Sequence, residues 1–189
     1  MRANGPGQSA YLLLDVIDLL TPLAIPYAVV GGHAVSFYGV PRFTKDADAT
    51  VWLAGTGRTG GDLKAQLTTA NYDVKLSLGD IEDPIAGVVV VRDQHENQVD
   101  LLLGVRGMDA DAAQRCLTTT LLGESVRMIG VEDLIAMKLF AGGVQDLEDV
   151  RGILEVSKER LNFGLLQRLS DRYGKNVGEA LERVLQPEE

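Results

Sequence analysis

The most restrictive feature of this sequence is a glycine pair followed thirteen residues later by two aspartates that are one residue apart. Gly31-Gly32 closes a short apolar run, and Asp46-Ala47-Asp48 opens a second one. Side chains alternate between the two faces of a strand, so Asp46 and Asp48 are expected on the same face. Two carboxylates brought close together force one of them to keep its proton unless a cation neutralises them. The pattern therefore predicts a strand, a sharp turn into a helix, and a second strand that carries a carboxylate pair.

Asp100 is a candidate third carboxylate. It interrupts the apolar segment "VDLLLG" at a position where a buried strand would otherwise carry Val or Leu. Hard divalent cations such as Mg²⁺ bind carboxylate oxygens and keep water and substrate phosphates as their other ligands. The residues alone leave a second interpretation open, in which Asp46 and Asp48 merely end a strand and Asp100 lies on a solvated face.

The glycine pair suits a phosphate group. A strand that turns sharply into a helix presents free backbone N–H groups and the positive end of the helix dipole. Glycine also lets a phosphate approach the backbone closely. The alternative is an ordinary strand-to-helix turn that binds no ligand.

Together these motifs resemble those of the DNA polymerase β-like nucleotidyltransferases, which show a hydrophobic residue, Gly, Gly or Ser, a similar gap, and then Asp-x-Asp between apolar residues. The segment "GGHAVSFYGVPRFTKDADATVW" resembles the start of the bacterial minimal nucleotidyltransferases of the AbiEii/AbiGii toxin kind, in which Arg-x-Thr/Ser-x-Asp-x-Asp is typical. The segment "VEDLIAMKLFAGGVQDLEDVRGIL" resembles their later block, and the similarity runs from about Tyr27 to Leu154. This chain departs from the later block at Gln145, where the family often has Lys or Arg, and at Gly142-Gly143.

The resemblance implies an α/β (α+β) fold with a mixed sheet followed by a small helical part. It also implies transfer of a nucleoside monophosphate from an NTP to an acceptor, with release of pyrophosphate. Asp46, Asp48 and Asp100 would then be the catalytic residues and would hold two Mg²⁺ ions, with Asp100 on the acceptor side. The implied nucleotide-binding residues are Gly31, Gly32, Arg42, Thr44, Lys45, Lys138 and Asp146.

The resemblance also indicates an acceptor. For the toxin-like members this is RNA, above all tRNA, and an antitoxin protein is the implied partner. An antibiotic of the aminoglycoside type is the second acceptor considered. A third reading is a catalytically silent nucleotidyltransferase-like binding protein, against which the complete set of three aspartates argues.

Lys138 has a separate argument from helix periodicity. Val131, Leu134, Ile135, Lys138 and Gly142 share one face of a predicted helix, and Lys138 is the one charged residue among them. We expect its side chain to point into a cleft and, as the resemblance implies, to meet the triphosphate. The alternative is that the side chain extends along the surface to reach water.

Asp146 and Asp149 have two readings. As N-cap and N3 residues they would simply begin the next helix. As members of the later block they would belong to the site, and both are secondary candidates. His33, beside the glycine pair, is a weaker candidate for the pocket, and His95 is expected in a hairpin turn.

The segment "GTGRTG", Gly55 to Gly60, matches the dinucleotide fingerprint Gly-x-Gly-x-x-Gly and lies between a predicted strand and a predicted helix. The strand before it carries the carboxylate pair, which a buried central strand of a Rossmann fold would not tolerate. The later strands form a hairpin rather than repeated βαβ units. We therefore predict a flexible loop here and no dinucleotide site.

Hydrophobic periodicity predicts an α/β sheet domain over residues 1–130 and a helical part over residues 131–189. An antiparallel hairpin is predicted at Gly87–Arg92 and Gln98–Leu103, around the polar turn "DQHEN", and Val126–Ile129 is predicted as a last edge strand. The other predicted strands are Tyr27–Val30, Ala47–Leu53 and Tyr72–Leu76. The predicted helices are Leu12–Leu20, His33–Tyr38, Asp62–Ala70, Val131–Gly143, Asp146–Ser157, Phe163–Tyr173 and Val177–Leu185.

Composition narrows the classes of function. The 189 residues carry a formal net charge of −9, which argues against a protein that coats nucleic acid but leaves a local contact open. Two aspartates interrupt the apolar run Leu12–Leu20 and no small-residue cleavage site follows, so neither a signal peptide nor a membrane span is expected. The single cysteine, Cys116, allows no internal disulfide and favours the cytoplasm. Disorder is expected at Met1–Gln8 and Gln186–Glu189.

Overall fold

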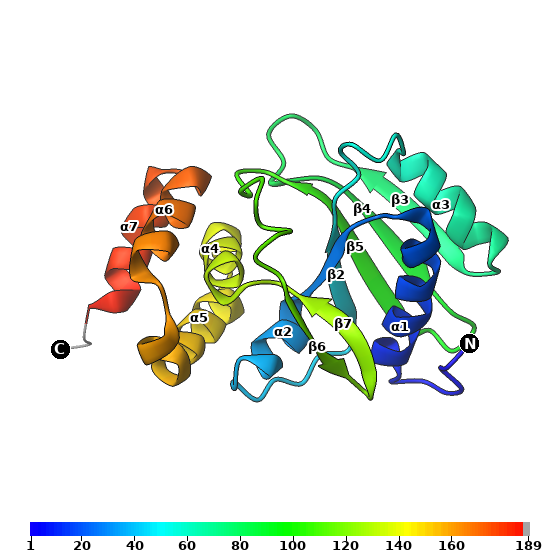
Figure 1. Ribbon diagram of the computed structural model, residues 1–189, viewed down its shortest axis with the longest axis horizontal. Helices are drawn as coiled ribbons and strands as arrows, with labels where there is room; N and C mark the ends of the chain where they lie inside the picture. Colours follow the sequence, from blue (N-terminus) through cyan, green and yellow to red (C-terminus); the bar gives the residue numbers. More distant parts are fainter. Residues whose placement is uncertain (187–189) are drawn as a thin grey trace.

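The structure, a computed structural model in which residues 1–186 are described, is a mixed sheet with helices packed on it and at one of its ends (Figure 1). The strand order is β3-β4-β5-β2-β1-β7-β6. The strands are β1 Tyr27–Val30, β2 Ala47–Val51, β3 Asp73–Leu78, β4 Ile85–Arg92, β5 Gln98–Val105, β6 Leu117–Leu121 and β7 Glu124–Met128. The helices are α1 Ser9–Leu20, α2 Gly31–Phe37, α3 Gly60–Thr69, α4 Val131–Ala141, α5 Val144–Ser157, α6 Phe163–Tyr173 and α7 Lys175–Leu185. The predicted fold class, a mixed α/β sheet followed by a helical part, is confirmed.

The middle of the sheet positions the candidate carboxylates. Strand β2 pairs antiparallel with β1 and parallel with β5, and Asp48 is in register with Asp100 of β5. Residues in register on neighbouring strands lie side by side and direct their side chains to the same face. The register therefore places Asp48 and Asp100 together, on strands whose apolar neighbours Ala47, Ala49 and Leu101 are fully buried.

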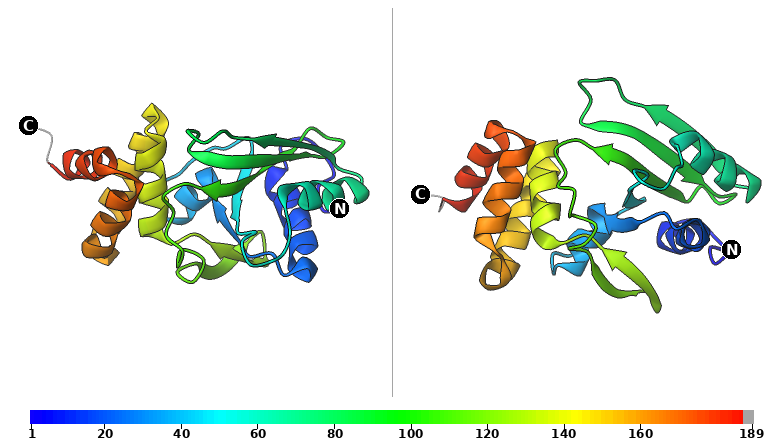
Figure 2. Two further views of the ribbon diagram at one scale, coloured as in Figure 1. Left: turned by 90° about the horizontal axis from the view of Figure 1, so that it is seen from above. Right: turned by 45° about the horizontal axis from the view of Figure 1, so that its top comes forward.

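Helices α1 and α3 cover part of the sheet, and α4 to α7 form a separate group at the other end of the molecule (Figures 1 and 2). The apolar face of α1, with Leu12, Leu13 and Leu20, is completely buried in the core, as are Leu63 and Leu67 of α3. Removing this much apolar surface from water is the main favourable contribution to folding. No helix within residues 1–186 is long and apolar enough to cross a membrane.

The junction between the sheet and the helical part is short, and both backbone polar groups of Ile129 in it are hydrogen-bonded. Strand β7 runs parallel to β1, with Met128 in register with Val29. The next residue, Ile129, donates its N–H to the carbonyl of Val29 at 3.1 Å, and its carbonyl accepts from the Tyr38 hydroxyl at 2.6 Å. Helix α4 begins two residues later, so the central sheet directly fixes where this helix starts.

The structure corrects the prediction of a disordered N-terminus. Ala3 is buried, and Arg2 Nη1 contacts Asp15 Oδ1 at 3.0 Å and Asp18 Oδ2 at 2.6 Å. The two aspartates that interrupt the apolar run of α1 therefore attach the segment before it to the helix. Of the predicted disordered stretch at the other end, residues 187–189 lie outside the described part of the chain.

Three further differences concern the sheet and the helix starts. Val126–Ile129 was predicted as an edge strand, but β7 lies inside the sheet and β6 is the edge. The sequence "LTTTL" of β6 gives no clear apolar alternation, because all five of its residues are exposed or half-buried threonines and leucines at the margin of the sheet. Helix α2 begins at Gly31 rather than at His33, so the glycine pair forms its first turn.

Candidate active site

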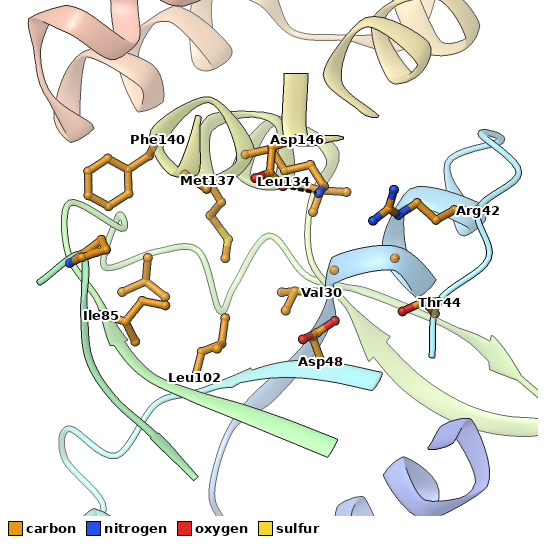
Figure 3. A pocket seen from close by; sticks show the side chains of 16 residues that line it. Val30, Arg42, Thr44, Asp48, Ile85, Leu102, Leu134, Met137, Phe140 and Asp146 are labelled. Carbon is orange, nitrogen blue, oxygen red and sulfur yellow. Dashed lines mark hydrogen bonds and ion pairs between the residues drawn. The ribbon is translucent and has the colours of Figure 1, made fainter. Parts of the chain in front are cut away.

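A pocket of about 310 Å³ lies where the central strands meet α2 and α4 (Figure 3). Its lining comes from the end of β1, the loop before β2, strands β2, β4 and β5, and helix α4 with the residues after it. The predicted site residues that line it are Gly31, Gly32, Arg42, Thr44, Asp48, Lys138 and Asp146. The fold therefore gathers residues from three distant segments of the chain around one cavity.

The glycine pair makes room for side chains of the site. Gly31 has a φ of +61°, a conformation that residues with a Cβ rarely adopt, and a Cβ added there would overlap the Asp48 carboxylate. A Cβ on Gly32 would approach the Cβ of Thr44 to 2.8 Å. Thr44 in turn donates its hydroxyl hydrogen to the carbonyl of Asp46 at 2.7 Å, which holds the loop at the start of β2. Asp48 and Thr44 can thus pack directly on the first turn of α2.

The three aspartates interact electrostatically. Burial, followed by the charges of Asp100 and Asp46, raises the pKa of Asp48 to about 6. Burial also raises the pKa of Asp100, although Gln98 Nε2 donates a hydrogen bond to its Oδ1 at 2.9 Å. Asp46 lies immediately before β2, and neither it nor Asp100 lines the pocket. Asp48 is therefore the carboxylate of this set that faces the cavity.

The candidate ligands of a Mg²⁺ ion are the three aspartates. Within residues 1–186, no three His, Cys, Asp or Glu side chains converge as a ready-made metal site. The residue types nevertheless fit, because Asp48 and Asp100 are neighbours in register and Asp46 precedes Asp48 by two residues. A cation near Asp48 would also stabilise its ionised form, which burial and then the charges of Asp100 and Asp46 disfavour. The assignment of the three aspartates as ligands stays a prediction.

Two cations from different parts of the fold share one buried carboxylate. Lys138 of α4 is buried, and its Nζ lies 2.8 Å from Asp149 Oδ2 and 2.9 Å from Asp146 Oδ1. Arg42, from the loop before β2, lies with Nη1 3.4 Å from Asp149 Oδ1. Asp149 itself is 2% exposed. This carboxylate joins the sheet and the helical part across the polar end of the pocket.

The structure thus separates the two readings of Asp146 and Asp149. Helix α5 begins at Val144 with Gly143 as its N-cap, so the capping reading of these aspartates is wrong. One helical turn apart, they reach the same lysine. Sequence reasoning missed the role of Asp149 as a bridge, although its spacing from Asp146 was a usable signal. Gln145, where the family often has a cation, is exposed, and its Nε2 contacts Asp149 Oδ1 at 3.4 Å.

The other end of the pocket is apolar and was not predicted. Ile85 and Leu102 approach it from the β4/β5 hairpin, and Met137 and Phe140 approach it from α4 (Figure 3). The ring of Phe140 packs against that of Tyr173 with centroids 4.8 Å apart. No single sequence motif connects these residues, because the hairpin and the helix come together only in the fold.

Several predicted candidates lie away from the pocket. Lys45 is exposed, and its backbone carbonyl accepts a hydrogen bond from the Ser9 hydroxyl at 2.8 Å. His33 does not line the cavity, and burial lowers its pKa. His95 lies in the turn between β4 and β5, as expected. Cys116 is half-buried, and burial raises the pKa of its thiol.

The glycine-rich segment between β2 and α3 does not contribute to the pocket. Gly55 and Gly57 have positive φ and open surroundings, as a surface loop allows. Thr59 caps α3, since its hydroxyl accepts from the N–H of Asp62 and the Asp62 side chain accepts from the N–H of Thr59. The segment is therefore a loop and a helix cap, and the expectation that it holds no dinucleotide stays a prediction.

Comparison with known proteins identifies the fold. No model of a known protein family and no curated protein sequence matches the chain. Among solved structures, ANT(2'')-Ia in complex with adenylyl-2''-tobramycin aligns with a TM-score of 0.60 at 15% identity, over 87% of this chain and 98% of the other. An antigenic nucleotidyltransferase-like protein from Paracoccidioides brasiliensis aligns with a TM-score of 0.57 at 17% identity, over 97% and 90%.

The lincosamide antibiotic adenylyltransferase LnuA, bound to lincomycin, aligns with a TM-score of 0.51 at 14% identity, over 81% of this chain and 99% of the other. These similarities cover nearly the whole length of each structure, and their low identities establish the fold alone. The chain has the nucleotidyltransferase fold.

Proposed function

We propose that this protein is a Mg²⁺-dependent nucleotidyltransferase that moves a nucleoside monophosphate from an NTP to an acceptor and releases pyrophosphate. The observation that supports this most directly is the meeting of Asp48 with Lys138 and Arg42 in one pocket, beside Asp100 on the next strand. Carboxylates for a cation and cations for a triphosphate are the two elements that phosphoryl transfer requires. The nucleotidyltransferase fold of the chain supports the same activity.

Each residue has a defined task in this proposal. Mg²⁺ bound by Asp46, Asp48 and Asp100 would lower the pKa of the acceptor hydroxyl and screen the triphosphate. Asp100 helps to take the acceptor proton as the new oxygen–phosphorus bond forms and the bond to pyrophosphate breaks. Lys138 and Arg42 offset the charge that develops on the leaving pyrophosphate. Gly31, Gly32 and Thr44 form the wall against which the phosphates lie, with Asp146 and Lys45 as further nucleotide-binding candidates.

The proposed acceptor is RNA, with tRNA first, in a toxin and antitoxin pair that works in the cytoplasm. This choice rests on the resemblance of the segments around Asp48 and Lys138 to the toxin-like nucleotidyltransferases. The second candidate is an antibiotic, which the tobramycin adduct of one structural neighbour and the lincomycin of another support. A binding protein without catalysis is the third.

Calorimetry followed by a transfer assay tests the proposal. NTP should bind with Mg²⁺ and bind weakly in EDTA, because a triphosphate and three carboxylates repel each other without a cation. Labelled NTPs incubated with total RNA and with a panel of aminoglycosides should then release pyrophosphate with one acceptor class. Asp48→Asn should abolish release, whereas Asp73→Asn, an exposed strand aspartate, should not. Equal binding in Mg²⁺ and EDTA contradicts the metal assignment, and Mg²⁺-dependent binding without release under any condition identifies a binding protein.

A further inference from the structure

The pocket has two ends of different chemistry on either side of Asp48 (Figure 3). Arg42, Thr44 and Lys138 with its partner Asp146 form the polar end. The opposite end is lined by Pro84, Ile85, Leu102, Val105, Met137 and Phe140, which carry no charged or hydrogen-bonding side-chain group apart from the weakly accepting Met sulfur. The two ends belong to one continuous cavity, so one ligand with an anionic part and a flat apolar part can occupy both.

The position of the carboxylates indicates which ligand this is. Asp48 lines the cavity, but Asp100, the residue assigned to the acceptor side, does not. Under that assignment the acceptor approaches from outside this cavity, where Asp100 and Asp46 lie. The volume of about 310 Å³ is at the low end for small-molecule sites and suits one ligand rather than two.

Part of the backbone at the apolar end is also occupied. Ile85 and Val105 are in register in the β4/β5 ladder, and the carbonyl of Pro84 accepts from the N–H of Arg106 at 3.0 Å. The Pro84 carbonyl, engaged in this way, is not free to recognise the edge of a base. A base here would be held by burial and van der Waals contact between the hairpin and α4.

We propose that the apolar end is the nucleobase subsite of the NTP and that it binds the base without hydrogen-bond recognition, so that all four NTPs are accepted. This inference rests on the proposed function. A pocket that discriminates by apolar contact alone separates similar ligands by about 10–200-fold, whereas one that hydrogen-bonds its substrate rejects analogues by about 10⁴–10⁵-fold. The dissociation constants of ATP, GTP, CTP and UTP should therefore lie within about tenfold of one another, in the lower part of that apolar range.

Calorimetry with Mg²⁺ tests the subsite with five probes, the four NTPs and inorganic tripolyphosphate. Met137→Gln keeps the length and helix propensity of the side chain and places an amide in the apolar end. This substitution should weaken the affinity for every NTP by about tenfold or more and leave the affinity for tripolyphosphate unchanged. Leu102→Thr, from the opposite wall, should give the same pattern. Met108→Gln is the matched control, since Met108 is half-buried but lies outside this pocket.

Each outcome separates the readings. If Met137→Gln leaves NTP affinity unchanged, the base lies elsewhere and the subsite is wrong. If it weakens the binding of tripolyphosphate as much as that of ATP, the residue acts on the phosphates or on the fold, and the proposal is overturned in either case. The melting temperatures of both variants distinguish these two explanations. A preference of about 10³-fold or more for one NTP overturns base-independent binding. If no probe binds the wild type, the proposed function itself fails.

Discussion

Replacing Asp48 by Asn gives a quantitative test of how the site uses its carboxylates. Burial, and then the charges of Asp100 and Asp46, raise the pKa of Asp48 from 3.8 to about 6. The folded state thus holds this proton more tightly than the unfolded state, so the contribution of Asp48 to the free energy of unfolding falls as pH rises from 3.8 to about 6. Above that window the ionised carboxylate costs the metal-free protein about 3 kcal/mol, at about 1.36 kcal/mol per pKa unit.

Asn has nearly the size of Asp without its charge. In EDTA at about pH 8, we therefore expect Asp48→Asn to be more stable than the wild type by up to about 3 kcal/mol, which is a rise of roughly 6–12 °C in Tm for a chain of this length. At about pH 4 the two proteins should melt at nearly the same temperature. Mg²⁺ should raise the Tm of the wild type and have little effect on the variant, which should also be inactive.

Thermal unfolding followed by circular dichroism across this pH range is the assay, and Asp73→Asn is the control. Asp73 is an exposed strand aspartate, so its substitution measures the general effect of removing one negative charge from an acidic protein. A variant at Asp48 that melts below the wild type at about pH 8, or that differs from it equally at both pH values, would refute the argument. Asp48 would then stabilise the strand rather than serve a cation.

Three further substitutions test the geometry around the pocket. Gly31→Ala adds a Cβ at a φ of +61° and against the Asp48 carboxylate; we expect a loss of roughly 2 kcal/mol or more in urea unfolding, together with loss of transfer activity. Asp149→Asn removes the carboxylate shared by Lys138 and Arg42, and we expect it to lower the free energy of unfolding by roughly 3 kcal/mol. This value is at the low end for breaking a buried ion pair because Asp146 still faces Lys138. Lys138→Gln should weaken tripolyphosphate binding by about tenfold or more in calorimetry.

Matched controls make these results interpretable. Gly57→Ala has a similar φ of +70° but nothing within 4 Å of the added Cβ, so equal losses at both glycines would show that contact with Asp48 contributes nothing. Glu148→Gln changes an exposed neighbour on the helix of Asp149 and should be nearly neutral. Lys64→Gln removes an exposed lysine of α3, and an equal effect on tripolyphosphate would mean that Lys138 contributes only net charge.

Local patterns in the sequence predicted much of the fold. Strand β1 and helix α6 have the predicted ends, and the β4/β5 hairpin is present, because apolar runs between clear turns carry a strong local signal. Strand β6 was missed because its three consecutive threonines break any apolar alternation and the strand pairs only with β7 at the margin of the sheet. The prediction that Met1–Gln8 is disordered was wrong because the residues that hold this segment are distant in the sequence. The N–H of Gln8, for example, donates to Asn97 Oδ1 at 2.7 Å.

The part of the candidate site that was predicted also rests on local patterns in the sequence. The glycine pair and Asp48 are close in sequence and form a recognisable motif, and the single charge on an apolar helix face indicated Lys138. The bridge from Arg42 through Asp149 to Lys138 depends on how α4 and α5 pack against the loop before β2. The apolar end of the pocket likewise depends on the distance between a hairpin and a helix. Neither relation has a local signature.

The hydrogen-bonded junction at Ile129 has a consequence for how quickly a ligand can bind. Both backbone polar groups of Ile129 are engaged, with Val29 and with Tyr38, so a hinge motion of α4 about Ile129 would have to break one of these bonds. We therefore expect the cavity to exist before the nucleotide arrives, with no slow closing step. In stopped-flow experiments the observed binding rate should rise linearly with nucleotide concentration, and the Ile129 amide should exchange with deuterium only as fast as the whole molecule unfolds.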